Sequence, residues 1–454
     1  MKTYQDLLGI GESESKRIEF VKQVIGDHQA SAGYREGMTA YEYAAHRNVT
    51  ISQYQKLLYT MSGKAVPDNY SANWKMSSNF FHRFVTQEAQ YLLGNGIMWR
   101  EEDTADKLGG DFDTQLQKAG KAALIGGVAF GFWNLDHLDV FDIREFAPLY
   151  DEENGALMAG VRYWQLAADK PLRATLYELD GYTEYIWDGS KGSVLKEKRG
   201  YVMKTRTSAA DGTEIYDFTN YPGFPIVPLW GNPYKQSELV GLRESIDCYD
   251  LIKSGFANDL DDASQIYWVI QNAGGMDDVD LAKFIERMKV VHAAAVDDNG
   301  AKAEAHTLEV PYASREALLE RISGDLYRDA MALDTRQIAG GAVTATQIRA
   351  AYEPLNSKTD DFEYCVHEFL DGILKIAEID GEKATFTRSM LLNKSEEIQG
   401  IVQAAAYLDP DYVTRKLLMI NGDGDKADEM IEKIHSDELN RMDMNTEPEE
   451  EAEE

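Results

Sequence analysis

The sequence of 454 residues predicts an α+β protein that is mainly helical. Helical spacing of apolar residues dominates the first hundred residues and returns from residue 237 onward. Short runs typical of antiparallel strands fill the region between 125 and 230. A chain of this length exceeds one ordinary core, so we expect about two to four domains.

The N-terminal half changes from helices to strands. The run NFFHRFVTQEAQYLLGNG places Phe80, Phe84 and Leu92 on one helical face, and Gly94 and Gly96 predict its end. The runs AGVRYW, RATLYEL, YTEYIWDG and GYVMKTRT follow, and turn residues between them predict an antiparallel meander. It ends at YPGFPIVPLWGNP, where four prolines exclude a helix.

Two long helices are expected on either side of a small insert. The first, over 237–264, has one apolar face made of Leu242, Ile246, Tyr249, Ile252, Phe256 and Leu260. The insert, 265–312, is expected to hold a strand at IYWVIQ, a short helix, and a hairpin of VVHAAAV and AEAHTLEV about the turn DDNG. The second helix, over 313–335, has an apolar stripe of Leu319, Ile322 and Leu326.

The stretch RQIAGGAVTATQIRAAY separates that helix from a third. It has neither the lysine nor the preceding strand of a phosphate-binding loop, and Gly340 and Gly341 permit backbone conformations costly for other residues. Thr344 and Gln347 fit a capping box at the start of the third helix, and Pro354 predicts a kink in it. We therefore expect a flexible loop followed by a capped, kinked helix.

The C-terminal part is expected to be helical, with a tail that carries many acidic residues. SEEIQGIVQAAAYLDPDYVTRKLL and DKADEMIEKIHSDEL both suit helices. The final run, NTEPEEEAEE, is typical of a disordered segment.

The formal net charge of −32 argues against an ordinary nucleic-acid-binding protein, which neutralises phosphates with a basic face. It suits either a solvated, self-repelling surface or a surface that must not hold polyanions. The apolar run over 122–133 is too short for a bilayer, and no signal peptide opens the chain, so we expect a soluble protein. Cys248 and Cys365 have no metal-type spacing and are expected to be free thiols.

Motifs of catalysis and metal binding give no positive evidence. The chain has no GxxxxGK[ST], no complete GxGxxG or GxSxG, and no HExxH. Asp136, His137, Asp139 and Asp142 could form a metal cluster but suit a solvated loop better. NGDGDKADE departs from a calcium loop because Ala427 stands where a ligand is required. We expect no enzyme, cofactor or metal site, although an enzyme of unrecognised type stays an alternative.

Four segments, in their order along the chain, resemble the portal proteins of tailed bacteriophages, of the siphophage type. They are NFFHRFVTQEAQYLLGNGI, IGGVAFGFW with FAPLYDEENGALMAGVRYW, FPIVPLWGNPYKQSELVGLRESIDCYDLIKSGFANDL, and VTATQIRAAYEPLNSKTDDFE, which together span residues 70 to 380. The last resembles a segment in which an acidic residue commonly stands where this chain has Gln347. Their order and spacing, more than any single motif, support the resemblance.

The resemblance implies a portal fold that assembles as a ring, usually a dodecamer, around an axial channel at one capsid vertex. Double-stranded DNA would pass through it, without sequence-specific binding, during packaging and ejection. The implied partners are the terminase, the head–tail adaptor and the major capsid or scaffolding protein. The implied location is the virion, with the host cytoplasm during assembly. The alternative is another structural or scaffolding protein of a phage head without a DNA channel.

The same resemblance divides the chain into the parts of a portal. These are a wing (1–236), a first stem helix (237–264), a clip (265–312), a second stem helix (313–335), a tunnel loop (336–343), a kinked wing helix with its connection (344–394), crown helices (395–440) and an acidic disordered tail (441–454). Two helices with one apolar stripe each suit contacts with neighbouring subunits, although a hairpin within one subunit would also satisfy them.

Two groups of residues are the functional candidates. The DNA-facing tunnel loop would comprise Arg336, Gln337, Ile338, Gly340, Gly341 and Val343. The acidic channel wall would draw on Glu316, Glu320, Asp325 and Asp329. Acidic walls avoid the salt-dependent affinity that basic contacts would add to a conduit, and their repulsion acts within a Debye length of about 10 Å.

Overall fold

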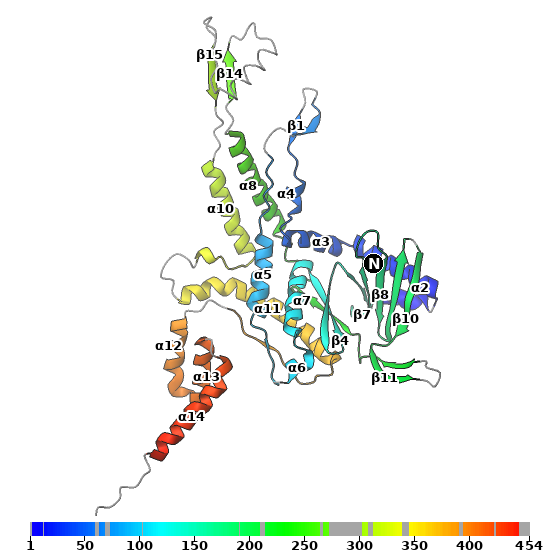
Figure 1. Ribbon diagram of the computed structural model, residues 1–454. Helices are drawn as coiled ribbons and strands as arrows, with labels where there is room; N and C mark the ends of the chain where they lie inside the picture. The colour runs from blue at the N-terminus through cyan, green and yellow to red at the C-terminus, as the bar shows by residue number, and fades with distance from the viewer. Residues whose placement is uncertain are drawn as a thin grey trace, which may run out of the picture. The chain divides into compact units, whose positions relative to one another are not determined.

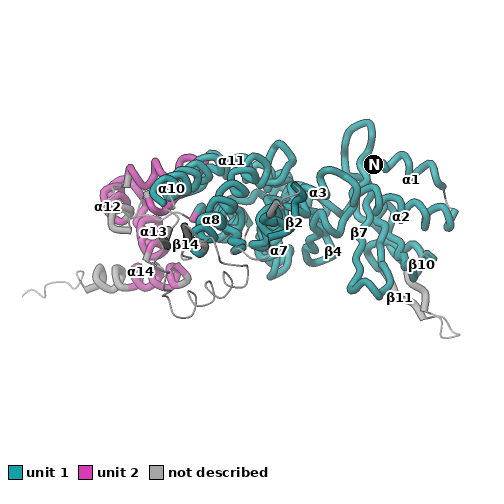
Figure 2. The backbone as a smooth tube through the Cα atoms, turned by 90° about the horizontal axis from the view of Figure 1, so that it is seen from above, with its two compact units in different colours: residues 1–332, 357–388 teal, residues 333–356, 389–454 magenta. Residues whose placement is uncertain are grey.

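The computed structural model describes most of the chain and divides it into two compact units. The described residues are 2–11, 13–59, 63–68, 73–101, 103–189, 191–208, 214–263, 267–271, 302–306, 312–337, 345–389, 394–421 and 424–444. The first unit holds residues 1–332 and 357–388, and the second holds 333–356 and 389–454 (Figure 2).

Four helices open the first unit, and the first two of them cover a sheet. They are α1 (Tyr4–Ile10), α2 (Glu14–Ala30), α3 (Ala32–Ala44) and α4 (Val49–Gln53). A capping box of Thr3 and Asp6 starts α1. One face of α2 buries Phe20, Val24 and Ile25 against the sheet, so this helix contributes a core of its own.

That sheet is the predicted antiparallel meander. Its strands are β6 (Phe146–Tyr150), β7 (Leu157–Trp164), β8 (Leu172–Glu178), β9 (Gly181–Asp188) and β10 (Lys191–Arg199), and each pairs with the next along the chain. Along β9 buried and partly exposed residues alternate, as expected of a strand with one face on a core. The predicted strand GYVMKTRT is not part of this sheet, because β11 (Val202–Ser208) pairs with β12 (Glu214–Thr219) in a separate two-stranded sheet.

A second sheet carries the central core. Its order is β13–β4–β5, with β13 (Ile226–Trp230), β4 (Val128–Asn134) and β5 (His137–Asp142) all antiparallel. A Cβ on Gly131 of β4 would lie 2.5 Å from the ring of Phe369. Glycine at this position therefore lets a buried phenylalanine lie directly on the strand.

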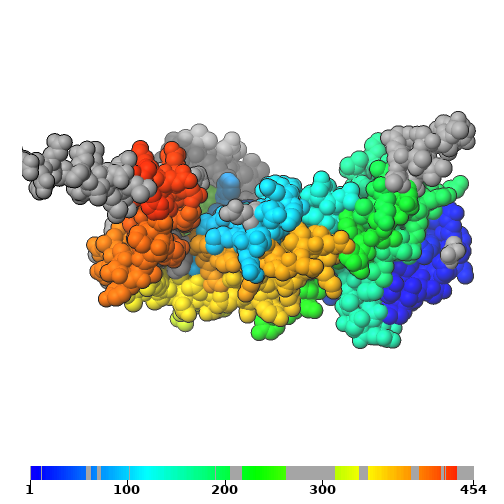
Figure 3. Space-filling model, turned by 90° about the horizontal axis from the view of Figure 1, so that it is seen from below, coloured from blue at the N-terminus to red at the C-terminus, as the bar shows by residue number. Residues whose placement is uncertain are grey.

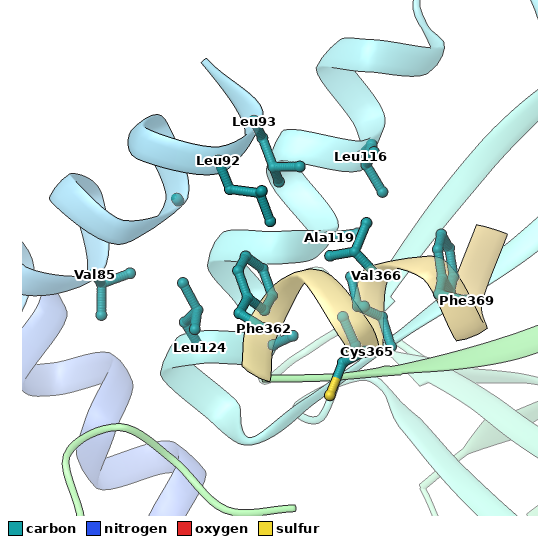
Figure 4. Packing of buried hydrophobic residues seen from close by; sticks show 14 of the residues in the cluster. Val85, Leu92, Leu93, Leu116, Ala119, Leu124, Phe362, Cys365, Val366 and Phe369 are labelled. Carbon is teal, nitrogen blue, oxygen red and sulfur yellow. The ribbon is translucent and has the colours of Figure 1, made fainter. Parts of the chain in front are cut away.

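Three helices pack around that core: α5 (Phe80–Leu93), α7 (Phe112–Gly126) and α11 (Ala345–Ile376). Phe362 and Val366 of α11 point between Leu92 of α5 and Ala119 of α7 (Figure 4). The short strands β3 (Ile97–Met98) and β16 (Thr385–Phe386) pair beside them, so residues near 100 and near 380 share the surface in Figure 3. The predicted helix that ends at the glycines after Leu93 is confirmed. The connecting helix α6 spans Thr104–Leu108.

Helices α8 (Arg243–Ala263) and α10 (Tyr312–Asp329) run side by side (Figure 1). Tyr249 of α8 and Tyr327 of α10 both pack edge-on against Phe80 of α5, with ring centroids 5.0 and 6.2 Å from it. Aromatic contacts therefore fasten the base of both helices to the core.

Both long helices are shorter than predicted. The residues before Arg243 form turns instead of a helix. Gly241, with φ of +85°, lies in these turns, directly before α8 begins. At 1.5 Å per residue α8 is about 32 Å long, less than its predicted span. The second helix ends at Asp329 because Met331, with φ of +52°, closes a Schellman motif in which the amide of Ala332 donates to the carbonyl of Tyr327.

The insert between the two helices is described only in part. The predicted strand IYWVIQ is confirmed as β14 (Tyr267–Gln271), which pairs with β15 (Lys302–His306) in an antiparallel ladder. The predicted short helix, the strand VVHAAAV and the turn DDNG lie outside the described residues. A hairpin of β1 (Leu57–Tyr59) and β2 (Ala65–Pro67) follows α4.

The second unit is helical. It contains the start of α11, then α12 (Lys394–Ala404), α13 (Pro410–Asn421) and α14 (Ala427–Met444), with short 3-10 turns at Thr335–Gln337, Ala405–Tyr407 and Gly424–Lys426. An ion pair of Arg415 with Asp428 joins α13 to α14. The helix reaches Met444, so the first four residues of the predicted disordered tail are helical, and the rest lie outside the described residues. Within the described part of the chain, no helix has the length and apolar character needed to cross a membrane.

Candidate functional site

A ladder of polar side chains fixes α8 to an extended segment over 73–78. Asp250, Ser254 and Asn258 lie at four-residue spacing on the buried face of α8. Asp250 accepts from the amide of Ser78 at 2.9 Å, and Ser254 accepts from the amide of Met76 at 2.9 Å. Asn258 accepts from the amide of Trp74 at 2.6 Å. Every second amide of the segment therefore has its own acceptor on the helix.

The spacing of the ladder follows from the geometry of the two elements. Four residues of a helix rise about 6 Å, and two residues of an extended chain rise about 6.6 Å. Acceptors at every fourth position of the helix therefore have nearly the same spacing as amides at every second position of the extended segment. The apolar face predicted over 237–264 is a different one: Leu242 and Ile246 are buried there, whereas Leu260 is 51% exposed.

Loss of Asp250 is expected to loosen the extended segment. In Asp250→Ala the amide of Ser78 loses its acceptor, and the Asn48 amide loses a partner, which costs about 1–3 kcal/mol. We expect a lower unfolding temperature and faster proteolysis between residues 73 and 79. Glu244→Ala, an exposed change on the same helix, is the control. Equal proteolysis of the two variants would contradict a role for the ladder.

A buried group of three charges lies where the two long helices meet the core. The ammonium of Lys358 in α11 lies 2.8 Å from carboxylate oxygens of both Glu88 in α5 and Glu238. It also donates to the carbonyl of Ala330, just after α10, at 3.3 Å. Glu88 is only 2% exposed. Four chain segments, far apart in sequence, therefore converge on one ammonium group.

The turn that carries Glu238 is held on the end of α7. The amide of Glu238 donates to the carbonyl of Leu124 at 3.0 Å, and the hydroxyl of Ser237 donates to the carbonyl of Ile125 at 2.6 Å. Gly127, with φ of +85°, lies so close to this turn that an added Cβ would be 3.0 Å from the carbonyl carbon of Gln236. The position of Glu238 therefore depends on a glycine that ends α7 in a left-handed conformation.

Burial and neighbouring charges shift the pKa values of Glu88 and Lys358 for different reasons. Burial, helped by the nearby carboxylate of Glu238, raises the pKa of Glu88 to about 7 against the attraction of Lys358. Burial alone would lower the pKa of Lys358, but the two carboxylates outweigh it and raise that pKa to about 12. The ammonium faces two anions, whereas Glu88 faces one cation and one anion, which accounts for both directions.

Glu88 is expected to make stability depend on pH. Its pKa is higher in the folded chain than its ordinary value of 4.5, so the folded chain binds more protons between pH 4.5 and about 7. The contribution of Glu88 to stability therefore falls as pH rises through that window. Relative to wild type, Glu88→Gln should gain about 1–3 kcal/mol of stability between pH 4.5 and 7.5, measured by urea unfolding. A difference that does not change with pH would contradict this.

The acidic wall candidates lie on α10 and reach solvent to different degrees. Glu316, Glu320 and Asp329 are exposed, and Asp325 is half-buried. Asp325 forms an ion pair with Arg328 and lies 3.9 Å from Arg321. The predicted apolar stripe of α10 is confirmed in part, since Leu326 is fully buried and Ile322 is half-buried.

Of the predicted tunnel loop, the structure describes only the beginning. Arg336 lies in a 3-10 turn, and its guanidinium contacts the carboxylate of Asp334 at 2.8 Å. The carboxylate of Asp334 therefore offsets the charge of Arg336, and the place of Arg336 in a tunnel loop stays a prediction. Gln337 ends the same turn, and the other loop residues (Ile338, Gly340, Gly341 and Val343) lie outside the described residues.

The start of α11 is described from Ala345. Thr344 lies outside the described residues, so the capping box stays a prediction; Gln347 is exposed in the first turn. Pro354 lies inside the helix, where it has no amide to donate to the preceding turn. The boundary between the two units follows directly, after Asn356.

The residues considered as a possible metal cluster lie in or next to β5. Asp136 and His137 pair at 2.8 Å beside β5, with Asp139 at 3.8 Å from the same ring. Over the described residues, no group of three or more His, Cys, Asp or Glu side chains could hold a metal ion. Cys248 is exposed and Cys365 buried, and both are free thiols, as predicted.

Comparison with known proteins decides the family. The model of the family described as "Phage portal protein, SPP1 Gp6-like" matches residues 41–441. The chain belongs to this family. The predicted resemblance to portal proteins is therefore confirmed, and portal function with it.

Two portal proteins are similar to this chain over most of its length. The portal protein of Clostridium phage phiCD119 is 23% identical over 372 residues, which cover 72% of this chain and 77% of the relative. The portal protein of Bacillus phage SPP1 is 24% identical over 392 residues, covering 78% of this chain and 74% of the relative. A solved chain titled "Neck of native GTA particle computed with C12 symmetry" is 13% identical, with a TM-score of 0.40, and covers 74% of this chain and 89% of its own.

Proposed function

We propose that this portal protein assembles as a dodecameric ring around an axial channel for double-stranded DNA at one capsid vertex. Membership of the portal family is the observation that supports this most strongly. The ring would admit DNA during packaging and release it during ejection. This role is structural and requires no catalytic group, cofactor or metal.

The fold suggests how the chain divides between the parts of such a ring. We assign the stem to α8 and α10, the clip to the segment between them, and the crown to α12, α13 and α14. The wing comprises residues 1–236 with most of α11, and the tunnel loop spans residues 336–343. The aromatic contacts and the Lys358 group then join the stem to the wing.

The four acidic candidates cannot all face one direction. At about 100° per residue, Glu320 lies about 40° around α10 from Glu316, whereas Asp325 and Asp329 lie about 180° and 220° from it. The buried stripe that contains Leu326 lies between the two pairs. We therefore propose that one pair faces the channel while the other faces a neighbouring copy.

Charge reversal tests the acidic wall. The pair that lines the channel should create DNA affinity when replaced, because each lysine adds a phosphate contact repeated around the ring. We expect Asp325→Lys with Asp329→Lys, or else Glu316→Lys with Glu320→Lys, to retain duplex DNA in an electrophoretic mobility assay, and to lose it as salt rises. If neither double variant binds DNA more strongly than wild type, the acidic wall is contradicted.

The remaining partners follow from the proposed place in the particle. A portal at a capsid vertex would contact the terminase during packaging, the head–tail adaptor afterwards, and the major capsid or scaffolding protein around it. The chain would be found in the virion, and in the host cytoplasm while particles assemble. The high negative charge supports passage of DNA without sequence-specific binding.

A further inference from the structure

We propose that a basic arm of one copy packs against the exposed, acidic N-terminal half of α10 in a second copy. The basic arm comprises the described residues 54–59, 63–68 and 73–78, which include β1 and β2. This inference rests on the proposed ring and identifies one contact that holds neighbouring copies together.

The basic arm differs in charge from the rest of the molecule. Between residues 54 and 78 the sequence has three lysines, Lys56, Lys64 and Lys75, and one acidic residue, Asp68, so its net charge is 3 − 1 = +2. The whole chain has a net charge of −32. A basic segment on such a protein is attracted to acidic surfaces, including those of other copies.

The basic arm also exposes apolar side chains while being held in place. Trp74 is 63% exposed, and Tyr54 and Leu57 are exposed as well. A hairpin of two short strands is marginal in water without further packing. The Trp74 amide is nevertheless bonded to Asn258 in the ladder, and the ammonium of Lys75 donates to the carbonyl of Ser52 at 2.9 Å. The arm is thus an ordered surface with aromatic anchors of the kind found in interfaces.

The first half of α10 offers the complementary surface. Tyr312 is 64% exposed, and Glu316 and Glu320, which follow it at four-residue spacing on the same side of α10, are exposed as well. Arg315 is already engaged within the subunit, where its guanidinium lies 2.5 Å from the carboxylate of Asp259 in α8. An aromatic side chain and two carboxylates of α10 therefore face solvent together, as apolar and basic groups do on the arm.

The Trp74 end of the arm and the start of α10 lie at the same level of α8 but on different sides of it. Asn258 of α8 contacts the arm, and the next residue, Asp259, contacts α10. Consecutive helical residues point about 100° apart, and Figure 1 shows α10 and the arm on either side of α8. This end of the arm can therefore meet the start of α10 of the next copy without any change of height along the stem. Repetition of such a head-to-tail contact closes a ring when the rotation between copies is a whole fraction of a turn.

Charge reversal and its rescue test this contact in the full-length protein. We expect Lys56→Glu with Lys64→Glu and Lys75→Glu to raise the concentration at which half of the chains are in rings by about tenfold or more, measured by mass photometry. Adding Glu316→Lys and Glu320→Lys should restore assembly. Lys16→Glu with Lys22→Glu and Lys191→Glu, exposed elsewhere in the first unit, makes the same change in net charge and should leave assembly unchanged.

Each outcome bears on the proposal. Rings as stable as those of wild type in the arm variant would overturn it, as would an equal loss in the control variant. A failure of the α10 changes to restore assembly would overturn the choice of α10 as partner. Rings absent from the wild-type protein itself would instead contradict the proposed function.

Crosslinking provides a second test that leaves the charges of the arm largely intact. In a Cys248→Ser background, Lys75→Cys combined with Glu316→Cys should give, with a short bismaleimide, a ladder of covalent oligomers on denaturing gels. A head-to-tail contact predicts this ladder only when both cysteines are on each chain. Its absence from rings formed by the double variant would overturn the contact.

Discussion

Lys358→Met is expected to lower the free energy of unfolding of the first unit by about 3–5 kcal/mol. The substitution removes the cation from Glu88 and Glu238 while keeping most of the side-chain volume. The buried carboxylate of Glu88 then has no compensating charge, and the carbonyl of Ala330 loses a donor. Urea or thermal unfolding at pH 7.5 would measure the loss.

Two variants distinguish this cause from a general effect of losing a lysine. Lys375→Met, at an exposed position of the same helix, should change stability by less than about 0.5 kcal/mol. Adding Glu88→Gln and Glu238→Gln to Lys358→Met should recover much of the loss, because no uncompensated charge then stays buried. Equal losses in the Lys358→Met and Lys375→Met variants would contradict a structural role for the charge group.

Gly340→Pro combined with Gly341→Pro is expected to reduce DNA packaging strongly while leaving ring assembly intact. Two prolines would fix the backbone of a loop that we propose to move against DNA near the axis. The loop follows α10 and its Schellman turn, so its stiffening should not disturb the stem. Packaged DNA per particle, and the proportion of rings in purified protein, would measure the two effects separately.

A matched change in the same loop should have no such effect. Ala339→Gly with Ala342→Gly increases backbone freedom and is expected to package normally. Normal packaging by the double proline variant would contradict a moving loop. Loss of rings in that variant would instead show that the two glycines are needed for ring assembly.

The spacing of apolar residues predicted most of the helices and strands, because each element buries one face and this requires apolar residues at regular intervals. The antiparallel meander and helix α5 follow from alternating or helically spaced apolar residues, such as Phe80, Phe84 and Leu92. The helix ends were less predictable. Met331 ends α10 in a left-handed conformation that a methionine seldom adopts, and nothing in its local sequence indicates a stop.

The two polar arrangements at the stem could not be predicted from composition in a chain with 78 acidic residues. The four-residue spacing of Asp250, Ser254 and Asn258 is the feature that would have indicated a polar face on α8. Lys358 stands between Leu355 and Phe362 on the apolar side of α11, which hints at a buried cation. Its partners come from distant segments, however, so only the fold brings Glu88 and Glu238 to it.

Electron microscopy of the purified full-length protein tests the central claim most directly. We predict rings with a central hole wide enough for duplex DNA, about 20 Å across or more, with α8 and α10 around it. Isolated rings need not have the copy number of the particle, so the hole and the closed symmetry are the decisive features. A protein that stays monomeric under assembly conditions, or a ring in which Glu316, Glu320, Asp325 and Asp329 all point away from the axis, would contradict the account.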